Sequence, residues 1–513
     1  MQDFYKKTSG NYHFKMGAVL SYITLGINCG ISIFFTPFMI RVLGENEYGL
    51  YQMIGAFAGY LSILDMGMSS AVTKYVTKYY RLKERKKEEN FLALMVLYYT
   101  VISFLVLLLG WIMYINIGVV FSDTLTDMEI LKAGRMFLIL IFNLIITLYG
   151  GIFRGIMNAY EYFSQAKSAE LIRVIMRVVL IYAILKLGGD SIGLVIIDTV
   201  LNLIFCFYRA YFSLHRIGSC FKIHGLDWSE LKEVAFYSFF VFLNLIFDQL
   251  NWKIDQMIIG MKISTAAVTV YSIGMNFSNY FMNFSIAVKS LFLPRVMQME
   301  VTGASGKDYT EFLIKTGRMQ GYLLFYLYFA FLFMGRQFIW IVMGKDYYEA
   351  WLSAVFVMSG LLVPLLQNAG HPILQAKNKH HIYVLVCLFI SIANAVFTWL
   401  IVEQKGIVGA AFMTMISFVA GQALFLSWYY QRKLHIDMKR FFGEITKANA
   451  VPVSCIIVFE LVVNYFFQTN RWEKFILHGL AYSVLYGIGV YLFGMNQEEK
   501  QYLFGVFKKN KCK

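Results

Sequence analysis

Apolar runs about as long as a bilayer is thick recur along this chain, and they constrain its fold more than any other feature. A hydrocarbon core of about 30 Å takes roughly 20 apolar residues in a helix. Only helices and closed barrels satisfy their backbone hydrogen bonds there, and runs this long select helices. We therefore predict an all-α integral membrane protein of about 14 transmembrane helices, with spans near residues 16–40, 48–72, 91–114, 136–158, 169–187, 192–213, 234–261, 268–293, 319–343, 351–376, 382–402, 407–430, 447–468 and 475–494.

The composition excludes a soluble globule of this size. Of the 513 residues, 58% are hydrophobic and only 15% are charged, which leaves too little polar surface to face water. The net charge of +15 does not indicate nucleic acid, because the basic residues fall in short gaps between apolar runs. They are concentrated on the side of the N-terminus, which predicts that both termini are cytoplasmic.

The two halves of the chain correspond at an offset of roughly 220 residues, a pattern typical of transporters. Asn28 matches Asp248, the turn at Gly44 matches the turn at Gly260, and Gly151 matches Gly370. We predict an N-terminal six-helix lobe, a second six-helix lobe, and a C-terminal region with two extra helices and a basic cytoplasmic tail. Their predicted boundaries are 1–213, 214–430 and 431–513.

Three segments carry a family resemblance: Pro37–Tyr51, Leu64–Ala71 and Asp255–Gly260. With the helix number and the repeat, they resemble the polysaccharide exporter family (O-antigen flippase, Wzx-like). This family is part of the multidrug/oligosaccharidyl-lipid/polysaccharide (MOP) exporter superfamily.

The resemblance implies two lobes around a central cavity with alternating access. Family members typically move undecaprenyl-diphosphate-linked oligosaccharides from the inner to the outer leaflet of the bacterial plasma membrane. It also implies a transporter that is not an enzyme and has no cofactor. A proton or sodium ion would drive it, and a glycan polymerase and a chain-length regulator would be its partners. The identity of the sugar does not follow from these motifs.

Charged residues inside the predicted spans are candidate site residues, because a charge in a bilayer must be paired or face water. Arg173 and Arg177 share a helix face with Glu170, and Arg154 lies at a similar depth. Guanidinium groups suit a diphosphate, so these arginines are candidates for binding a lipid head group. The alternative for these arginines is an ion pair with Glu170 or snorkelling to the membrane surface. Lys289 could face the same cavity, and snorkelling is the alternative for it as well.

The seventh predicted span carries a polar stripe at spacings of four, three and four residues: Asn244, Asp248, Asn251 and Asp255. This stripe and Asn28 could line the cavity, with the carboxylates binding a coupling ion and Lys253 contacting an anionic substrate. The alternative is a hydrogen-bond network between helices.

Two further residues belong to the resembling motifs. Asp65 lies beside small residues that let helices approach closely, which favours a role in packing. Arg41 precedes the turn at Gly44, where we expect a gate or an anchor at the interface, near Glu45 or Glu47.

The sequence has no phosphate-binding glycine loop and no nucleophile motif, so hydrolysis of ATP by this chain is not expected. It has no cysteine pair or histidine cluster at metal-ligand spacing, so no metal site is expected. Two other functions stay open: an ion-coupled multidrug exporter of the same superfamily, and a membrane scaffold for glycan-assembly enzymes.

Overall fold

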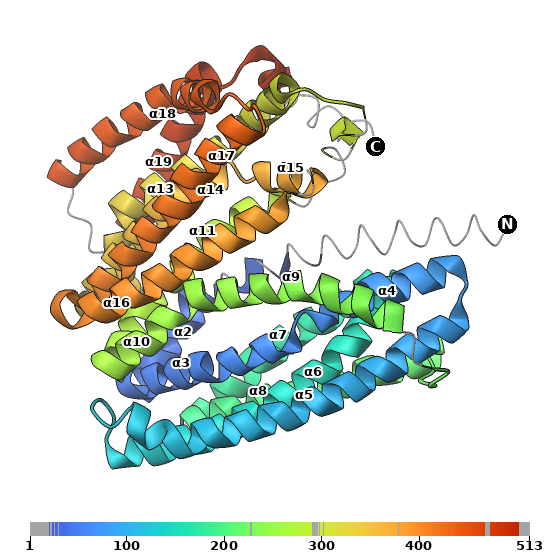
Figure 1. Ribbon diagram of the computed structural model, residues 1–513. Helices are drawn as coiled ribbons and strands as arrows, with labels where there is room; N and C mark the ends of the chain where they lie inside the picture. The colour runs from blue at the N-terminus through green and yellow to red at the C-terminus, as the bar shows by residue number, and fades with distance from the viewer. Residues whose placement is uncertain are drawn as a thin grey trace. The chain divides into compact units, whose positions relative to one another are not determined.

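The computed structural model describes residues 20, 23–24, 26–28, 30–225, 228–289, 296, 298–300, 302–377, 379–466 and 472–501. Every regular element in these ranges is a helix, which confirms the predicted all-α fold class (Figure 1). Contacts group the chain into two compact units, Met1–Thr269 and Val270–Lys513. The lobes were predicted from the correspondence between the two halves of the sequence. Contacts do not test that correspondence, so the lobe boundaries remain predictions.

The first unit consists of long helices that alternate with short interrupted ones. Its elements are η1 (Ile31–Phe35), α2 (Thr36–Leu43), α3 (Glu45–Gly59), η2 (Tyr60–Asp65), α4 (Met68–Leu82), α5 (Arg85–Val120), α6 (Asp127–Ala159), α7 (Phe163–Lys186), α8 (Ser191–Tyr211), η3 (Phe212–Ile217), α9 (Trp228–Trp252) and α10 (Ile254–Lys262). Helix α11 (Thr265–Lys289) begins at the end of this unit.

The second unit continues from α11 to the C-terminal helices. Its elements are α13 (Gly306–Val342), η4 (Lys345–Tyr347), α14 (Tyr348–Leu366), α15 (Gly370–Ala376), α16 (His380–Ser417), η5 (Phe418–Phe425), α17 (Leu426–Lys433), α18 (Met438–Phe466), α19 (Trp472–Gly489) and η6 (Val490–Gly494).

Within the described residues, eight helical stretches are long and apolar enough to cross a membrane. They cover nine of the predicted spans, because the stretch Tyr383–Lys433 takes in two of them, 382–402 and 407–430. Gly406, with a φ of 62°, marks a kink between these two spans inside α16. The other predicted spans are helical where they are described, but they are interrupted or carry charges.

Three predicted spans are broken helices among the described residues, and the tenth, near 351–376, divides at residues 367–369 between α14 and α15. The second, near 48–72, runs through α3, the 3₁₀ helix η2 and α4, with Met66 and Gly67 both left-handed at the junction. The seventh, near 234–261, is interrupted at Lys253, which is not helical. We expected each to be one continuous helix, because a hydropathy average does not detect a local break. Discontinuous helices in transporters often surround binding sites.

Helix α6 packs closely against α4 because glycines line the contact. A Cβ atom at Gly151 would lie 2.4 Å from Ser69 Oγ, and one at Gly155 would lie 2.6 Å from Val72 Cγ1. Small residues four apart allow the backbones of membrane helices to approach. Thr126 and Glu129 form a capping box that fixes the start of α6.

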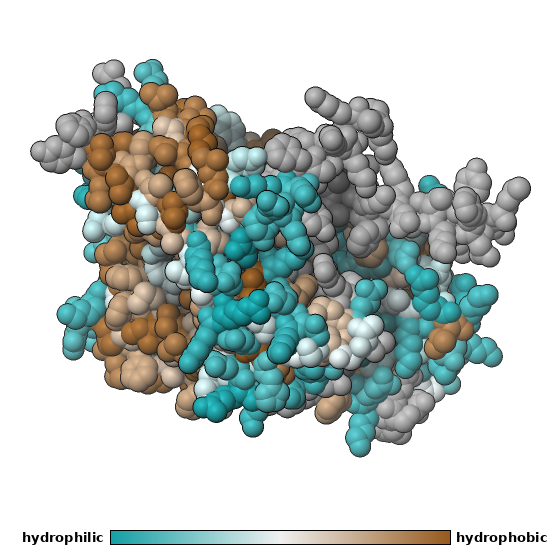
Figure 2. All heavy atoms as spheres, turned by 90° about the horizontal axis from the view of Figure 1, so that it is seen from above, coloured by the Kyte–Doolittle hydropathy of each residue, from teal (hydrophilic) through white to brown (hydrophobic). Residues whose placement is uncertain are grey.

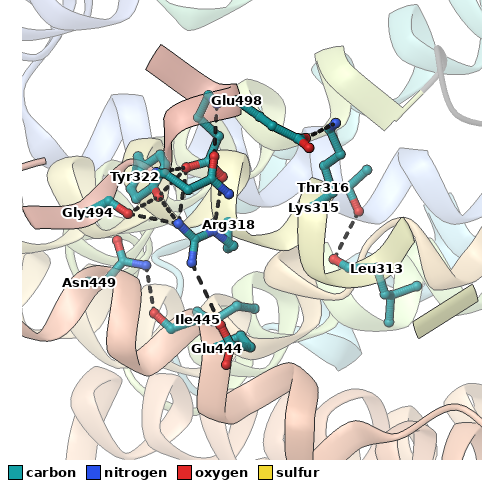
Figure 3. A network of polar contacts seen from close by, with 12 residues as sticks. Leu313, Lys315, Thr316, Arg318, Tyr322, Glu444, Ile445, Asn449, Gly494 and Glu498 are labelled. Atoms are coloured by element: carbon teal, nitrogen blue, oxygen red, sulfur yellow. Dashed lines mark hydrogen bonds and ion pairs between the residues drawn. The ribbon is translucent and has the colours of Figure 1, made fainter. Parts of the chain in front are cut away.

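The second unit ends in a compact group formed by α13, α18 and α19. Met334, Ile456 and Tyr482 are buried at its centre. Tyr482 and Tyr486 each donate a hydrogen bond to a carbonyl of α13. The segment after η6 is fastened to α13 by Arg318 and Tyr322 (Figure 3).

The surface fits a lipid environment. Large apolar side chains are exposed along α5, including Phe104, Trp111 and Val119. Figure 2 shows hydrophobic side chains over a broad area of one face, beside an area where hydrophilic side chains gather. Exposed apolar surface on this scale marks contact with membrane or a partner.

Candidate functional site

A cavity of about 590 Å³ lies among α3, α6, α7 and α8 of the first unit. Its lining combines charged, amide and small residues: Asn28, Gly55, Ala58, Gly59, Ser62, Leu140, Asn143, Leu144, Thr147, Arg154, Arg173, Val174, Arg177, Asp198 and Asn202. Four residues named as candidates from the sequence therefore share one space: Asn28, Arg154, Arg173 and Arg177.

Arg154 and Arg173 line this cavity from adjacent helices. Arg154 projects from α6 and is exposed, while Arg173 projects from α7 and is half-buried. Neither makes a hydrogen bond or ion pair to a carboxylate among the described residues. Glu170, the partner considered from the sequence, instead pairs with Lys167 at 2.8 Å. Both guanidinium groups therefore remain available for an anionic ligand.

Arg177 lies one turn beyond Arg173 on α7 and has a carboxylate partner. Its Nε and Nη2 donate to the two oxygens of Asp198, at 2.5 and 3.1 Å. Tyr51 joins them: its hydroxyl accepts from Arg177 at 3.0 Å and donates to Asp198 at 3.0 Å. This three-residue group links α3, α7 and α8, and we call it the Arg177 triad.

A row of amide and hydroxyl groups follows along α6 and α8. Asn202 Nδ2 donates to Asn143 Oδ1 at 2.7 Å and to Thr147 Oγ1 at 2.6 Å. Asn143 Nδ2 donates to Thr199 Oγ1 at 3.1 Å. Groups that both donate and accept suit the hydroxyls of a sugar.

Arg209 adds positive charge behind the lining. It is buried on α8, and its Nε has no hydrogen-bond partner among the described residues. Arg154 and Arg173 are its electrostatic neighbours. Three cationic side chains therefore concentrate at one end of the cavity.

The structure also shows which residues the sequence analysis missed. Asp198, Tyr51, Asn143, Asn202 and Arg209 were not among the candidates. Asp198 and Arg209 are charged residues in a predicted span, so the rule that singled out Arg173 would also have found them. The partners of Asp198 depend on the packing of three helices, which no local pattern shows.

The polar stripe is described only in part. The side chains of Asn244, Asp248 and Lys289 lie outside the described residues. Asn251 is buried and donates to the Phe247 carbonyl of its own helix at 2.8 Å.

Asp255 is buried at the start of α10, and Lys253 occupies the break before it. Asn251 and Asp255 therefore belong to consecutive helices, α9 and α10, and the role of the stripe remains a prediction.

Asp65 stabilises the break in the second span. Its Oδ1 accepts from Tyr99 at 2.7 Å and from Ser69 at 3.1 Å, across α5 and α4. These bonds fit the packing role expected for it, but its function is not tested by them.

Arg41 is exposed in the last turn of α2, directly before Gly44. Glu47, one of the partners considered for it, pairs with Lys132 and accepts a hydrogen bond from Ser191.

Comparison with known proteins places the chain in a family. A sequence profile of the polysaccharide biosynthesis protein family matches residues 16–300. The chain belongs to this family. A relative in Bacillus subtilis, "Uncharacterized membrane protein EpsK", is 21% identical over 94% of this chain and 95% of its own. A "Putative O-antigen transporter" of Salmonella typhi is 20% identical over 81% of this chain and 95% of its own.

Solved structures show the same fold. The "Lipid II flippase MurJ, inward closed conformation" matches with a TM-score of 0.71 and 14% identity, over 92% of this chain and 97% of that chain. A multidrug resistance transporter of the MATE family, described as inward-facing and of the MOP superfamily, matches with a TM-score of 0.60 and 13% identity, over 80% of this chain and 99% of that chain.

These comparisons confirm several predictions from the sequence. The predicted resemblance to a polysaccharide exporter family is confirmed at the level of the polysaccharide biosynthesis protein family, and the solved structures confirm the predicted all-α fold. The names of two of these proteins, a putative O-antigen transporter and a lipid II flippase, describe transport by those proteins.

Proposed function

We propose that this protein is a flippase that moves an undecaprenyl-diphosphate-linked oligosaccharide from the inner to the outer leaflet of a bacterial plasma membrane. One observation carries the proposal: Arg154, Arg173 and Arg177 line a single cavity together with the amide row of Asn143 and Asn202. The arginines of this lining suit a diphosphate, and its amides suit the hydroxyls of a sugar.

The electrostatics of the cavity favour an anionic ligand. Its lining holds three arginines and one carboxylate, Asp198, and Arg209 lies behind them. Guanidinium groups stay charged and bind phosphate oxygens with two donors at once. In a low-dielectric surrounding such interactions are stronger than in water.

The predicted orientation of the chain defines an inner and an outer end of the cavity. With both termini cytoplasmic, Arg154 and Arg209 lie toward the inner end and the Arg177 triad lies toward the outer end. The head group would enter from the cytoplasm and be released outward by alternating access, while the lipid tail stays in the bilayer.

The driving ion and the partners are part of the same proposal. Asp248 and Asp255 would bind a coupling proton or sodium ion, and Lys253 would contact the substrate's negative charge. A glycan polymerase and a chain-length regulator would act on the product at the outer face. The hypothesis of a multidrug exporter receives less support, because an arginine-lined cavity suits anionic substrates.

The decisive experiment measures where the lipid-linked oligosaccharide resides in a deletion strain, with and without the restored gene. We expect it to accumulate in the inner leaflet and to reach the outer leaflet when the gene is restored. Unchanged sidedness in the deletion strain would overturn the flippase proposal.

Single substitutions connect the activity to the cavity. Arg173→Gln and Arg154→Gln should each reduce flipping at normal protein levels. Lys167→Gln is the matched control, because Lys167 is on α7 but pairs with Glu170 and does not line the cavity. Full activity in both arginine variants would show that the cavity is not the binding site.

A further inference from the structure

The Arg177 triad differs from the other cationic groups of the cavity in having its own anion. Asp198 meets Arg177 through two hydrogen bonds, the geometry that a phosphate would adopt with the same guanidinium group. Arg154 and Arg173, in the same lining, have no carboxylate in a hydrogen bond among the described residues. Asp198 therefore occupies the place beside Arg177 that an anionic ligand in the cavity would take.

The pair is on the cavity wall and is not sealed between helices. The side chains of Arg177 and Asp198 are 26% and 20% exposed, and both line the cavity. A ligand can reach the guanidinium without unpacking α7 from α8. Tyr51 can keep its bond to Arg177 while Asp198 moves away, because it contacts both partners.

We propose that Asp198 is a displaceable counter-ion: the substrate's diphosphate takes its place on Arg177, and Asp198 returns when the head group leaves. This inference rests on the proposed function and adds a specificity-determining residue to it. It explains how a cavity rich in arginine can release an anion. Transport requires binding that is strong enough to admit a ligand and weak enough to let it leave.

The alternative is a permanent ion pair that holds α7 against α8. In that arrangement the diphosphate binds only Arg154 and Arg173, and Asp198 never leaves Arg177. The two arrangements predict opposite effects of removing the carboxylate charge. A permanent pair makes Asp198 important for stability, whereas a displaceable counter-ion makes it a competitor of the ligand.

Binding of a short polyprenyl diphosphate tests the proposal. Geranylgeranyl diphosphate and geranylgeranyl monophosphate would be titrated into the full-length protein in nanodiscs and followed by calorimetry. For Asp198→Asn we expect at least about tenfold tighter binding of the diphosphate, because a competing charge is removed. The gain for the monophosphate should be smaller, and outward flipping should be slower because release is slowed.

A double-mutant cycle with Arg177→Gln tests whether Asp198→Asn tightens diphosphate binding through Arg177. Asp198→Asn should tighten binding much less when Arg177 is already replaced, because no guanidinium is then freed. Asp190→Asn is the matched control: Asp190 pairs with Lys132 at the start of α8, outside the cavity, and asparagine still caps a helix. It should leave affinity unchanged.

Two outcomes separate this inference from the proposed function. If the wild-type protein does not bind the diphosphate, or Arg173→Gln does not weaken binding, the proposed function itself fails. If both behave as expected but Asp198→Asn leaves affinity unchanged or lower, the counter-ion inference alone is overturned. Should Asp198→Asn not fold, Tyr51→Phe removes one hydrogen bond from each partner and should tighten binding several-fold; unchanged affinity there would overturn the inference.

Discussion

Arg318 Nε lies 2.9 Å from Glu499 Oε1, and this ion pair fastens the segment after the last predicted span to α13 (Figure 3). The two side chains are only 11% and 8% exposed. The Tyr322 hydroxyl also lies within hydrogen-bond distance of two acceptors, Glu499 Oε2 at 3.1 Å and the Gly494 carbonyl at 2.8 Å, and can donate its one hydrogen to either. The pair is largely shielded from water and is joined by two hydrogen bonds from Arg318 Nε and Nη2, so it should contribute measurably to stability.

We expect Glu499→Gln and Arg318→Gln each to lower the free energy of unfolding by about 1.5–3 kcal/mol, the range for hydrogen bonds to charged groups. The double variant should lose less than the sum, because the two residues share one interaction. Thermal unfolding of the purified protein in nanodiscs measures all three. Strict additivity would show that the two side chains act independently.

The neighbouring pair Lys315–Glu498 is the control for this cycle. Its nitrogen and oxygen lie 3.3 Å apart, but the side chains are 41% and 75% exposed. Exposed ion pairs are screened by water and contribute roughly 0–1 kcal/mol. Lys315→Gln should therefore unfold at nearly the wild-type temperature.

The same contact should weaken in acid. Burial alone would raise the pKa of Glu499, but hydrogen bonds from Arg318 and the Asn496 amide hold that pKa below its ordinary value. A carboxylate with a lowered pKa in the folded state adds stability above the unfolded pKa, roughly 4.3, and loses it as the pH falls. Lowering the pH from 7 to about 4 should thus destabilise the wild-type protein more than Glu499→Gln. Equal losses in both would contradict this assignment.

A second buried pair joins the last two long helices. His478 Nε2 and Glu460 Oε1 are 3.0 Å apart, and the side chains are 5% and 0% exposed. His478→Leu would leave Glu460 buried without this hydrogen-bond partner and should cost about 1–3 kcal/mol. Replacing both residues by leucine should restore most of that loss, because replacing both partners of a hydrogen bond by apolar groups can be nearly neutral. Unfolding temperatures of the single and double variants decide the point.

The sequence predicted the architecture well because hydrophobic length is a local property. Runs such as 91–114 and 136–158 need no knowledge of neighbours to be read as spans, and α5 and α6 contain them. Breaks were not predicted, since a window of about 20 residues averages over a short interruption. The dipeptide Met66–Gly67 and the charge of Lys253 were the available signals for the breaks in the second and seventh spans.

Some of the candidate site residues line one cavity, and their partners were not predicted for a related physical reason. The cost of a charge in a bilayer singles out Arg154, Arg173 and Arg177 from sequence alone. Which of them has a partner depends on helices that are distant in sequence: Asp198 reaches Arg177 from α8, and Tyr51 reaches both from α3. Long-range packing therefore decides which arginines are free for a ligand.

The start of α11 packs against the start of α3, and a glycine makes this contact possible. A Cβ at Gly49 would lie 1.8 Å from the carbonyl oxygen of Thr265 and 2.5 Å from its carbon. Thr269 Oγ1 donates to the Glu45 carbonyl at 2.7 Å beside it. Because the obstacle is backbone, the added carbon cannot be accommodated by rotating a side chain.

Gly49→Ala should therefore destabilise the protein by about 1–3 kcal/mol, the usual cost of overpacking. Gly55→Ala in the same helix is the matched control, since nothing lies within 4 Å of a Cβ there. Alanine favours a helix over glycine by roughly 0.5–1 kcal/mol, so this control should be neutral or slightly stabilising. Equal unfolding temperatures for the two variants would mean that α3 and the start of α11 are not held this closely.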